Sequence, residues 1–246
     1  MTRSLAALSL ACLLTVAVAV ATYAQVGTPT IPSWVGNLVM GLDPLAGADP
    51  ASPTVTDALG FKFELFFTAQ DDSDPKNPTN QVISMEPTNT GAIGVAIRKL
   101  NPGVKIDTLT DQLQLKYLFP TRSCGGGSPR FQLAIDTDGD GTSNGNAFGY
   151  VGHGPFGTGC LTAVWDIIDM TDNVGRWDLS QFGGGMTMTW DLAVLFVNSA
   201  FPNHQVLRGS LVDDSATFSP PATGKAFYDL VTIGHRTLEN WQDTVH

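Results

Sequence analysis

The stretch FQLAIDTDGDGTSNGNAFGY, residues 131–150, joins two strand-like segments through a loop of aspartates and glycines. In its first part Phe131, Leu133 and Ile135 alternate with smaller or polar residues, which is the pattern of a strand that buries one face. The polar run DTDGDGTSNGN is rich in turn formers, and AFGY then resumes an apolar segment. The stretch therefore predicts a strand, an aspartate loop and a further strand.

Alternation of this kind recurs on both sides of the loop. In GFKFELFFTA, residues 60–69, the apolar side chains of Phe61, Phe63 and Leu65 share one face. The segment 71–80 is predicted to be a polar loop because turn formers dominate it. Many short strands joined by Gly, Pro and Asp turns predict an all-β fold, a two-sheet β-sandwich of jelly-roll type. The other predicted strands are QVISMEP (81–87), AIGVAIRKL (92–100), DTLTDQLQLKYLFP (107–120), HQVLRGSLVDDS (204–215) and AFYDLVTIGHRTL (226–238).

One segment has helical periodicity instead. TWDLAVLFVNSAF, residues 189–201, predicts one short surface helix that Thr189 can cap at its N-terminus. Its apolar residues at helical spacing are Trp190, Val194, Val197 and Phe201.

The amino-terminal residues 1–24 have the features of a signal peptide. Arg3 supplies the positive charge, an unbroken apolar run follows, and small residues precede Gln25. We expect cleavage after Ala24 and a secreted, extracellular protein with no membrane attachment after cleavage. An uncleaved membrane anchor is the alternative, because the apolar run is slightly long. The predicted organisation after the signal peptide is an extended lead-in (25–54), a β-sandwich domain (55–240) and a tail (241–246).

Removal of the signal peptide would leave two cysteines, Cys124 and Cys160. An even pair in an exported chain predicts a disulfide, and two free thiols are the alternative.

Composition narrows the class of protein. Of 246 residues, 43% are hydrophobic and 15% charged, which is typical of a globular chain. The net charge of -10 would repel a phosphate backbone, so we expect no nucleic-acid partner.

The aspartate loop predicts a calcium ion. Asp136, Asp138 and Asp140 alternate and Gly141 follows, and such closely spaced carboxylates repel one another unless a cation neutralises them. The loop departs from an EF-hand at its twelfth position, where Ala147 replaces the bidentate Glu. We interpret calcium as a structural cofactor, and a metal-free hairpin is the alternative. Further ligands are expected from the Thr142 main chain, Asn144, Asn146 or a distant carboxylate among Asp166, Asp169 and Asp172.

Catalytic patterns are scarce. The four histidines are scattered without metal-ligand spacing, and no GxSxG motif occurs. Glu64 and Glu86 could form a glycosidase pair, so an extracellular carbohydrate-active enzyme stays an alternative. Other candidate acids are Asp213, Asp214 and Asp229. No catalytic residue is assigned.

Sugar binding is predicted from aromatic residues beside polar ones. Trp177 with Arg176 and Gln181, together with Tyr150, could stack on a sugar ring and bind its hydroxyls. The alternative is that the tryptophans fill the core. Other aromatic candidates are Trp165, Trp190, Trp241 and Tyr228.

Three motifs together carry a resemblance: CGGGSPRFQLAIDTDGDGTSNGNAFGY (124–150), RWDLSQFGG (176–184) and FYDLVTIGHRTL (227–238). They resemble exported bacterial β-sandwich proteins, mostly uncharacterised, which look like jelly-roll carbohydrate-binding modules. The resemblance covers residues 55–238 and implies a two-sheet fold, a structural calcium and glycan binding. The leading hypothesis is non-catalytic recognition of polysaccharide or a cell-surface glycan. An enzyme of carbohydrate chemistry and a structural or adhesive envelope protein are the alternatives.

Overall fold

The structure is a computed structural model, and it describes residues 54–56, 62–67, 69–87, 94–125, 127–152, 159–214, 223–234 and 237–238. These all belong to one compact unit, Pro50–His246. The predicted signal peptide and tail, and the lead-in up to residue 53, lie outside the described residues. In the part of the chain that the structure describes, no helix has the length and apolar character needed to cross a membrane.

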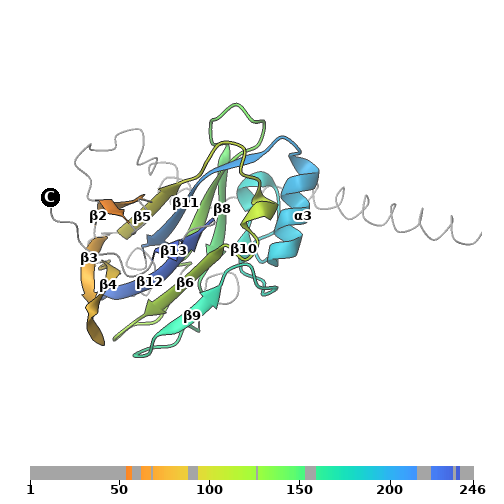
Figure 1. Ribbon diagram of the computed structural model, residues 1–246. Coiled ribbons are helices and arrows are strands. Elements are labelled where there is room, and N and C mark those ends of the chain that lie inside the picture. Colours follow the sequence, from red (N-terminus) through yellow and green to blue (C-terminus); the bar gives the residue numbers. More distant parts are fainter. Residues whose placement is uncertain are drawn as a thin grey trace, which may run out of the picture. The chain divides into compact units, whose positions relative to one another are not determined.

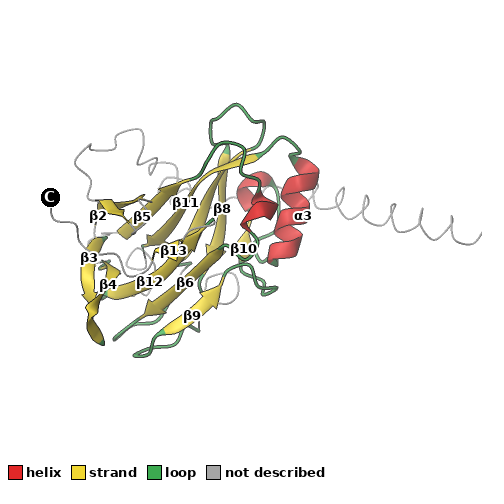
Figure 2. Cartoon of the chain, viewed as in Figure 1, coloured by secondary structure: helices red, strands yellow, loops and turns green. Residues whose placement is uncertain are grey.

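The chain forms two antiparallel sheets, as Figures 1 and 2 show. The first sheet has seven strands in the order β1 (Thr54–Thr56), β2 (Lys62–Phe67), β5 (Gly94–Lys99), β11 (Gln205–Asp213), β7 (Arg130–Asp136), β8 (Gly145–Tyr150) and β10 (Trp177–Asp178). The second sheet has six strands in the order β3 (Gln70–Asp74), β4 (Asn77–Met85), β12 (Ala226–Ile233), β6 (Leu113–Leu118) and β9 (Asp166–Asp169), with β13 (Thr237–Leu238) paired to β12. This confirms the all-β, two-sheet prediction, while jelly-roll connectivity stays a prediction.

A single core lies between the sheets. Phe131, Leu133 and Ile135 of β7 are all fully buried in it, as their alternation predicted. Leu115 of β6 and Tyr228 of β12 enter the same core from the second sheet. Burying one large aliphatic side chain stabilises the fold by about 1.5–3 kcal/mol, so this shared core holds the two layers together.

One predicted loop is a hairpin. Residues 71–80 form most of β3 and the start of β4, which pair with Asp72 opposite Val82 and turn at Pro75 and Lys76. The polar residues misled the prediction because β3 lies at a sheet edge, where side chains need not alternate between core and solvent.

Strand β5 buries both of its faces. Ala96 joins the main core, whereas Val95 and Ile97, the larger side chains of the alternating pattern, are buried but lie outside that core. Alternation therefore located the strand without showing which face points inward.

The predicted helix is confirmed as α3 (Trp190–Ala200). The Thr189 hydroxyl accepts a hydrogen bond from the Leu192 N–H at 3.4 Å, which caps the helix start. Two short 3-10 helices complete the elements, η1 (Ile106–Leu109) and η2 (Ser180–Phe182). Figure 2 shows α3 beside η1 at one end of the sheets.

The predicted disulfide between Cys124 and Cys160 is present, with its Cα atoms 5.5 Å apart. Nearby, the CGGGSPR motif supplies structural contacts. The buried Ser128 hydroxyl donates to Asp213 at 3.2 Å and accepts from the Asp214 N–H at 2.8 Å. Arg130 then holds Asp214 through two hydrogen bonds of 2.7 and 3.0 Å.

Candidate functional site

The aspartate loop connects β7 to β8, and Asp136 is its anchor. Asp136 is fully buried, and its carboxylate accepts hydrogen bonds from the N–H groups of Asp138, Gly139 and Gly141 at 3.1, 2.7 and 2.6 Å. The Gln205 side-chain amide donates a fourth at 2.8 Å. Burial opposes ionisation of Asp136, but these four donors outweigh it and lower the pKa of the carboxyl.

Two glycines make this loop geometry possible. Gly139 and Gly141 have φ of 84° and 88°, a left-handed conformation that other residues adopt only at a cost. A Cβ on Gly139 would lie 3.2 Å from the Asn203 carbonyl oxygen. The loop therefore packs closely against the segment that leads into β11.

The three predicted aspartate ligands converge. One carboxylate oxygen from each of Asp136, Asp138 and Asp140 lies within 4.8 Å of the other two. Asp138 and Asp140 are exposed, so a cation could reach them from solvent. An all-oxygen group of this kind suits a hard cation such as calcium.

The other predicted ligands differ in position. Asn144 belongs to the loop, where its side-chain oxygen accepts from the Thr137 N–H at 2.6 Å. The Thr142 N–H donates to the Asp140 carboxylate at 2.7 Å, so the main chain of Thr142 lies beside Asp140 in the loop. Asn146 lies on β8 opposite Ala134, and its buried side-chain oxygen has no hydrogen-bond partner.

The distant carboxylates are not grouped with the loop among the described residues. Asp166 accepts from the Tyr117 hydroxyl, Asp169 from Thr171, and Asp172 from Arg176.

The structure places Trp177, the predicted sugar-stacking residue, in the core. Its side chain is fully buried, its ring centroid lies 4.9 Å from that of Trp190, and its indole N–H donates to the Met170 carbonyl at 2.7 Å. No face of this ring can contact a sugar, so the alternative of a core tryptophan holds.

The polar residues predicted beside Trp177 make structural contacts. Arg176 is buried and donates to Asp172 and to the Tyr150 and Val151 carbonyls. The Tyr150 hydroxyl donates to Asp178 at 3.0 Å, and burial together with this carboxylate raises the tyrosine pKa. The half-buried Gln181 accepts from the Asn146 N–H at 2.7 Å. These contacts fix β8 to β10 and η2.

A different cluster lies on the outer face of the six-stranded sheet. Trp165 is half-buried there, and its indole N–H donates to Asp74 at 3.2 Å. Asn80 donates to Asp229 at 3.2 Å and to Asp74 at 3.5 Å. The Lys116 ammonium lies 3.2 Å from Asp229 and 4.7 Å from the centroid of the Trp165 ring. We call these five residues the Trp165 face.

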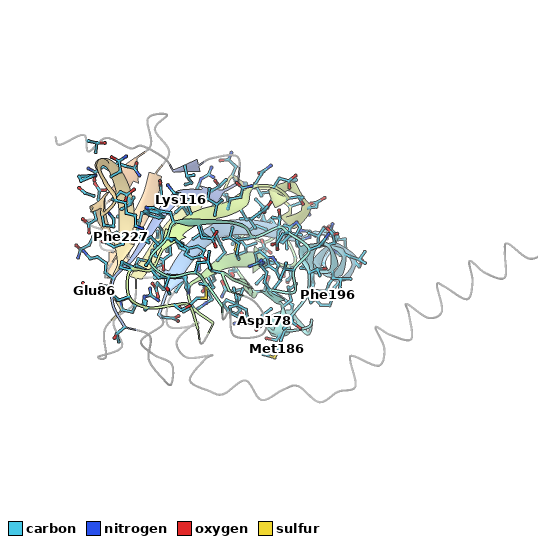
Figure 3. The ribbon with its side chains drawn as sticks, turned by 90° about the horizontal axis from the view of Figure 1, so that it is seen from below. Glu86, Lys116, Asp178, Met186, Phe196 and Phe227 are labelled. Carbon is cyan, nitrogen blue, oxygen red and sulfur yellow. A yellow bond between two sulfur atoms is a disulfide. The ribbon has the colours of Figure 1, made fainter. Side chains whose placement is uncertain are left out.

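An apolar rim adjoins the Trp165 face. Leu161, Val164 and Ile167 are 53, 45 and 62% exposed, and they precede or lie on the edge strand β9. Ile167 is opposite Lys116 in the pairing of β9 with β6, which places it beside the Trp165 face. Contiguous exposed apolar side chains mark interaction surfaces. Beneath them Trp165 packs on a small buried cluster of Val82, Leu118 and Phe227. Figure 3 shows the labelled Lys116 on the side of the molecule opposite Asp178 of the seven-stranded sheet.

The backbone beside this face is strained. Among the described residues three non-glycines have positive φ, and two of them are Ala163 (62°), next to Val164 of the apolar rim, and Leu230 (47°), next to Asp229. A leucine in this region costs roughly 1–2 kcal/mol. Leu230 lies where β12 loses regular register with β6, and such irregularities commonly redirect side chains near binding sites.

Sequence reasoning missed this cluster for a physical reason. Asp74 and Asn80 fell in the segment predicted to be a loop, and Trp165 had no feature that separated it from the buried tryptophans. Strand pairing brings residues 74, 116, 165 and 229 together, and no local pattern records that proximity.

The other predicted chemistry finds no site among the described residues. Glu86 is exposed, and the side chain of Glu64 lies outside the described part of the chain. Asp213 pairs with Arg122 and accepts from the buried Tyr228 hydroxyl at 2.7 Å, a structural link between the two sheets. His204, the one histidine among the described residues, is buried, and its Nε2 accepts a hydrogen bond from the Ile106 N–H.

Comparisons of the chain with family models, with curated proteins and with solved structures found no match. The fold therefore defines the class, a two-sheet antiparallel β-sandwich with one short α-helix among the described residues.

Proposed function

We propose that this protein is a secreted, non-catalytic β-sandwich that recognises polysaccharide through the Trp165 face and binds a structural calcium ion in its aspartate loop. The observation that carries the recognition role is the meeting of a half-exposed tryptophan, a polar network and an exposed apolar rim on one sheet face.

A sugar-binding site needs both apolar side chains and hydrogen-bonding groups. The apolar face of a pyranose ring packs on flat or apolar side chains, and its hydroxyls exchange hydrogen bonds with carboxylates, amides and ammonium groups. The Lys116 ammonium lies over the Trp165 ring and its side chain is 24% exposed, so it can donate a hydrogen bond to a sugar hydroxyl while it stays paired with Asp229. The resemblance to carbohydrate-binding modules supports the same ligand class.

Calcium is supported by the convergence of the three loop carboxylates. The Asn144 side chain and the Thr142 carbonyl are the further oxygen donors that the loop offers. The ion would act as a structural link between β7 and β8, because it would offset the repulsion between the carboxylates.

The main competing function is hydrolysis of a glycan. Asp74 and Asp229 are both 4% exposed and share the Asn80 amide, an arrangement of two carboxylates that glycosidases also use. We favour binding because each carboxylate is held by structural donors: Asp74 by the Lys76 N–H at 2.7 Å, and Asp229 by Lys116.

A glycan array tests the recognition role. We expect wild type to bind a set of glycans and Trp165→Ala to lose about tenfold in affinity, which corresponds to roughly 1.4 kcal/mol. Leu192→Ala is the control, because Leu192 is an exposed apolar residue on α3, outside the Trp165 face. If no glycan binds, a structural or adhesive role becomes the better description.

Reducing-sugar release separates binding from catalysis. We expect no release from the glycans that bind. Release that disappears in Asp229→Asn would show that the protein is an enzyme and not a binding protein.

A further inference from the structure

We infer that the Trp165 face selects uncharged polysaccharides over acidic ones; this inference rests on the proposed function. The supporting observation is that the ammonium groups of this face and its border already have partners within the protein.

Two ion pairs account for most of these charges. Lys116 lies 3.2 Å from Asp229, and Lys225 lies 2.7 Å from Asp72 at the border of the face. Both pairs lie on the outer side of the sheet, because Asp72 is opposite the outward-facing Val82. An acidic polymer would have to break these pairs to bind the two ammonium groups.

The remaining carboxylate and ammonium are also engaged. Asp74 accepts from the Trp165 indole and from the Lys76 N–H, and the Lys76 ammonium donates to the Ala163 carbonyl at 2.5 Å. The three lysines therefore match three aspartates in number. An anionic chain finds no cluster of unpaired ammonium groups here.

Long-range electrostatics favour the same selection. The protein carries a net charge of -10, so a polyanion is repelled before contact. A neutral chain approaches without this barrier, and its hydroxyls can exchange hydrogen bonds with Asn80, Lys116 and Asp229 while its apolar faces lie on the rim.

Matched polymers provide the test, with binding of the full chain measured by affinity electrophoresis. Two backbones are compared, each in a neutral and an acidic form: hydroxyethyl cellulose with carboxymethyl cellulose, and methyl-esterified pectin with polygalacturonate. For any backbone that binds, we expect the neutral form to bind about tenfold more tightly. We also expect no loss of affinity as NaCl rises from about 50 to about 500 mM, which screens ionic contacts.

Two variants make the test specific to this face. Trp165→Ala should weaken binding of the neutral form about tenfold. Asp72→Asn leaves Lys225 without its carboxylate partner, so it should raise affinity for carboxymethyl cellulose and polygalacturonate severalfold and leave the neutral forms unchanged. Both Lys225 and Asp72 are more than 30% exposed, so this change should not disturb the fold.

The outcomes separate the two proposals. Tighter binding of a charged form, salt-sensitive binding, or binding indifferent to Trp165→Ala would overturn the inference and leave polysaccharide recognition in place. Failure of all four polymers to bind would overturn polysaccharide recognition itself.

Discussion

Removing one charge from the aspartate loop should have opposite effects with and without calcium. Asp138→Asn is the most informative change, because Asp138 is exposed and its Oδ1 accepts from the Asp140 N–H at 3.3 Å, a contact that asparagine can keep. Asp136 is a poorer choice, since its carboxylate organises the loop through four donors whether or not an ion is present.

The expected magnitudes follow from the loop geometry and mass action. Without calcium, Asp138→Asn removes repulsion between carboxylates less than 5 Å apart, which is worth about 1 kcal/mol in water, so the variant should be slightly more stable than wild type. An extracellular site with a dissociation constant of about 0.1–1 mM gains about 1.4–2.7 kcal/mol at ~10 mM calcium. That gain raises the melting temperature of wild type by roughly 3–10 °C.

Differential scanning calorimetry of both proteins, in EDTA and in calcium, measures these effects. Asp111→Asn is the matched control: Asp111 is exposed, lies outside the loop, and has a φ of 59° that asparagine tolerates. The control should keep the full calcium shift. A calcium shift of equal size in wild type and Asp138→Asn, or no shift in wild type, would refute the calcium assignment.

Three further predictions concern stability. Replacing both Cys124 and Cys160 with serine should lower the free energy of unfolding by up to about 4 kcal/mol, measured by urea denaturation; equal stability would show that the bridge adds nothing. Burial lowers the pKa of His204, whose Nε2 accepts from the Ile106 N–H at 3.1 Å. The contribution of neutral His204 to the free energy of unfolding should therefore be complete above pH ~6.5 and be lost as the pH falls below that value. Urea midpoints from pH 8 to 5 check this, and His204→Gln should flatten the profile. Thr189→Ala should cost about 1 kcal/mol by removing the cap of α3, and an unchanged thermal midpoint would contradict the capping contact.

The charged network at one end of the sheets has a structural role. Asp213 accepts from Tyr228 of the opposite sheet and pairs with Arg122, and burial together with this carboxylate raises the pKa of Tyr228. Removing one partner of a buried ion pair typically costs 3–5 kcal/mol, because a charge is left without compensation. The CGGGSPR motif, which is part of the sequence that carries the resemblance, therefore stabilises the fold through Ser128 and Arg130.

Local sequence was sufficient where the controlling interactions are local. Alternation in residues 131–135 located β7, because side chains along a strand point to opposite faces. Thr189 marked the start of α3, because a cap acts within one helical turn. The spacing of Asp136, Asp138 and Asp140 likewise placed the three carboxylates together within one short loop.

Tertiary structure alone decided which tryptophan is buried and which is half-exposed. Trp177 and Trp165 both have polar neighbours in sequence, yet Trp177 packs against Trp190 in the core and Trp165 lies on the outer sheet face. The Trp165 face joins β3, β4, β6 and β12 with the residue before β9, and only the pairing order of the six-stranded sheet makes them neighbours. Periodicity along a strand shows that two faces exist, but which face meets the core depends on partners far along the chain.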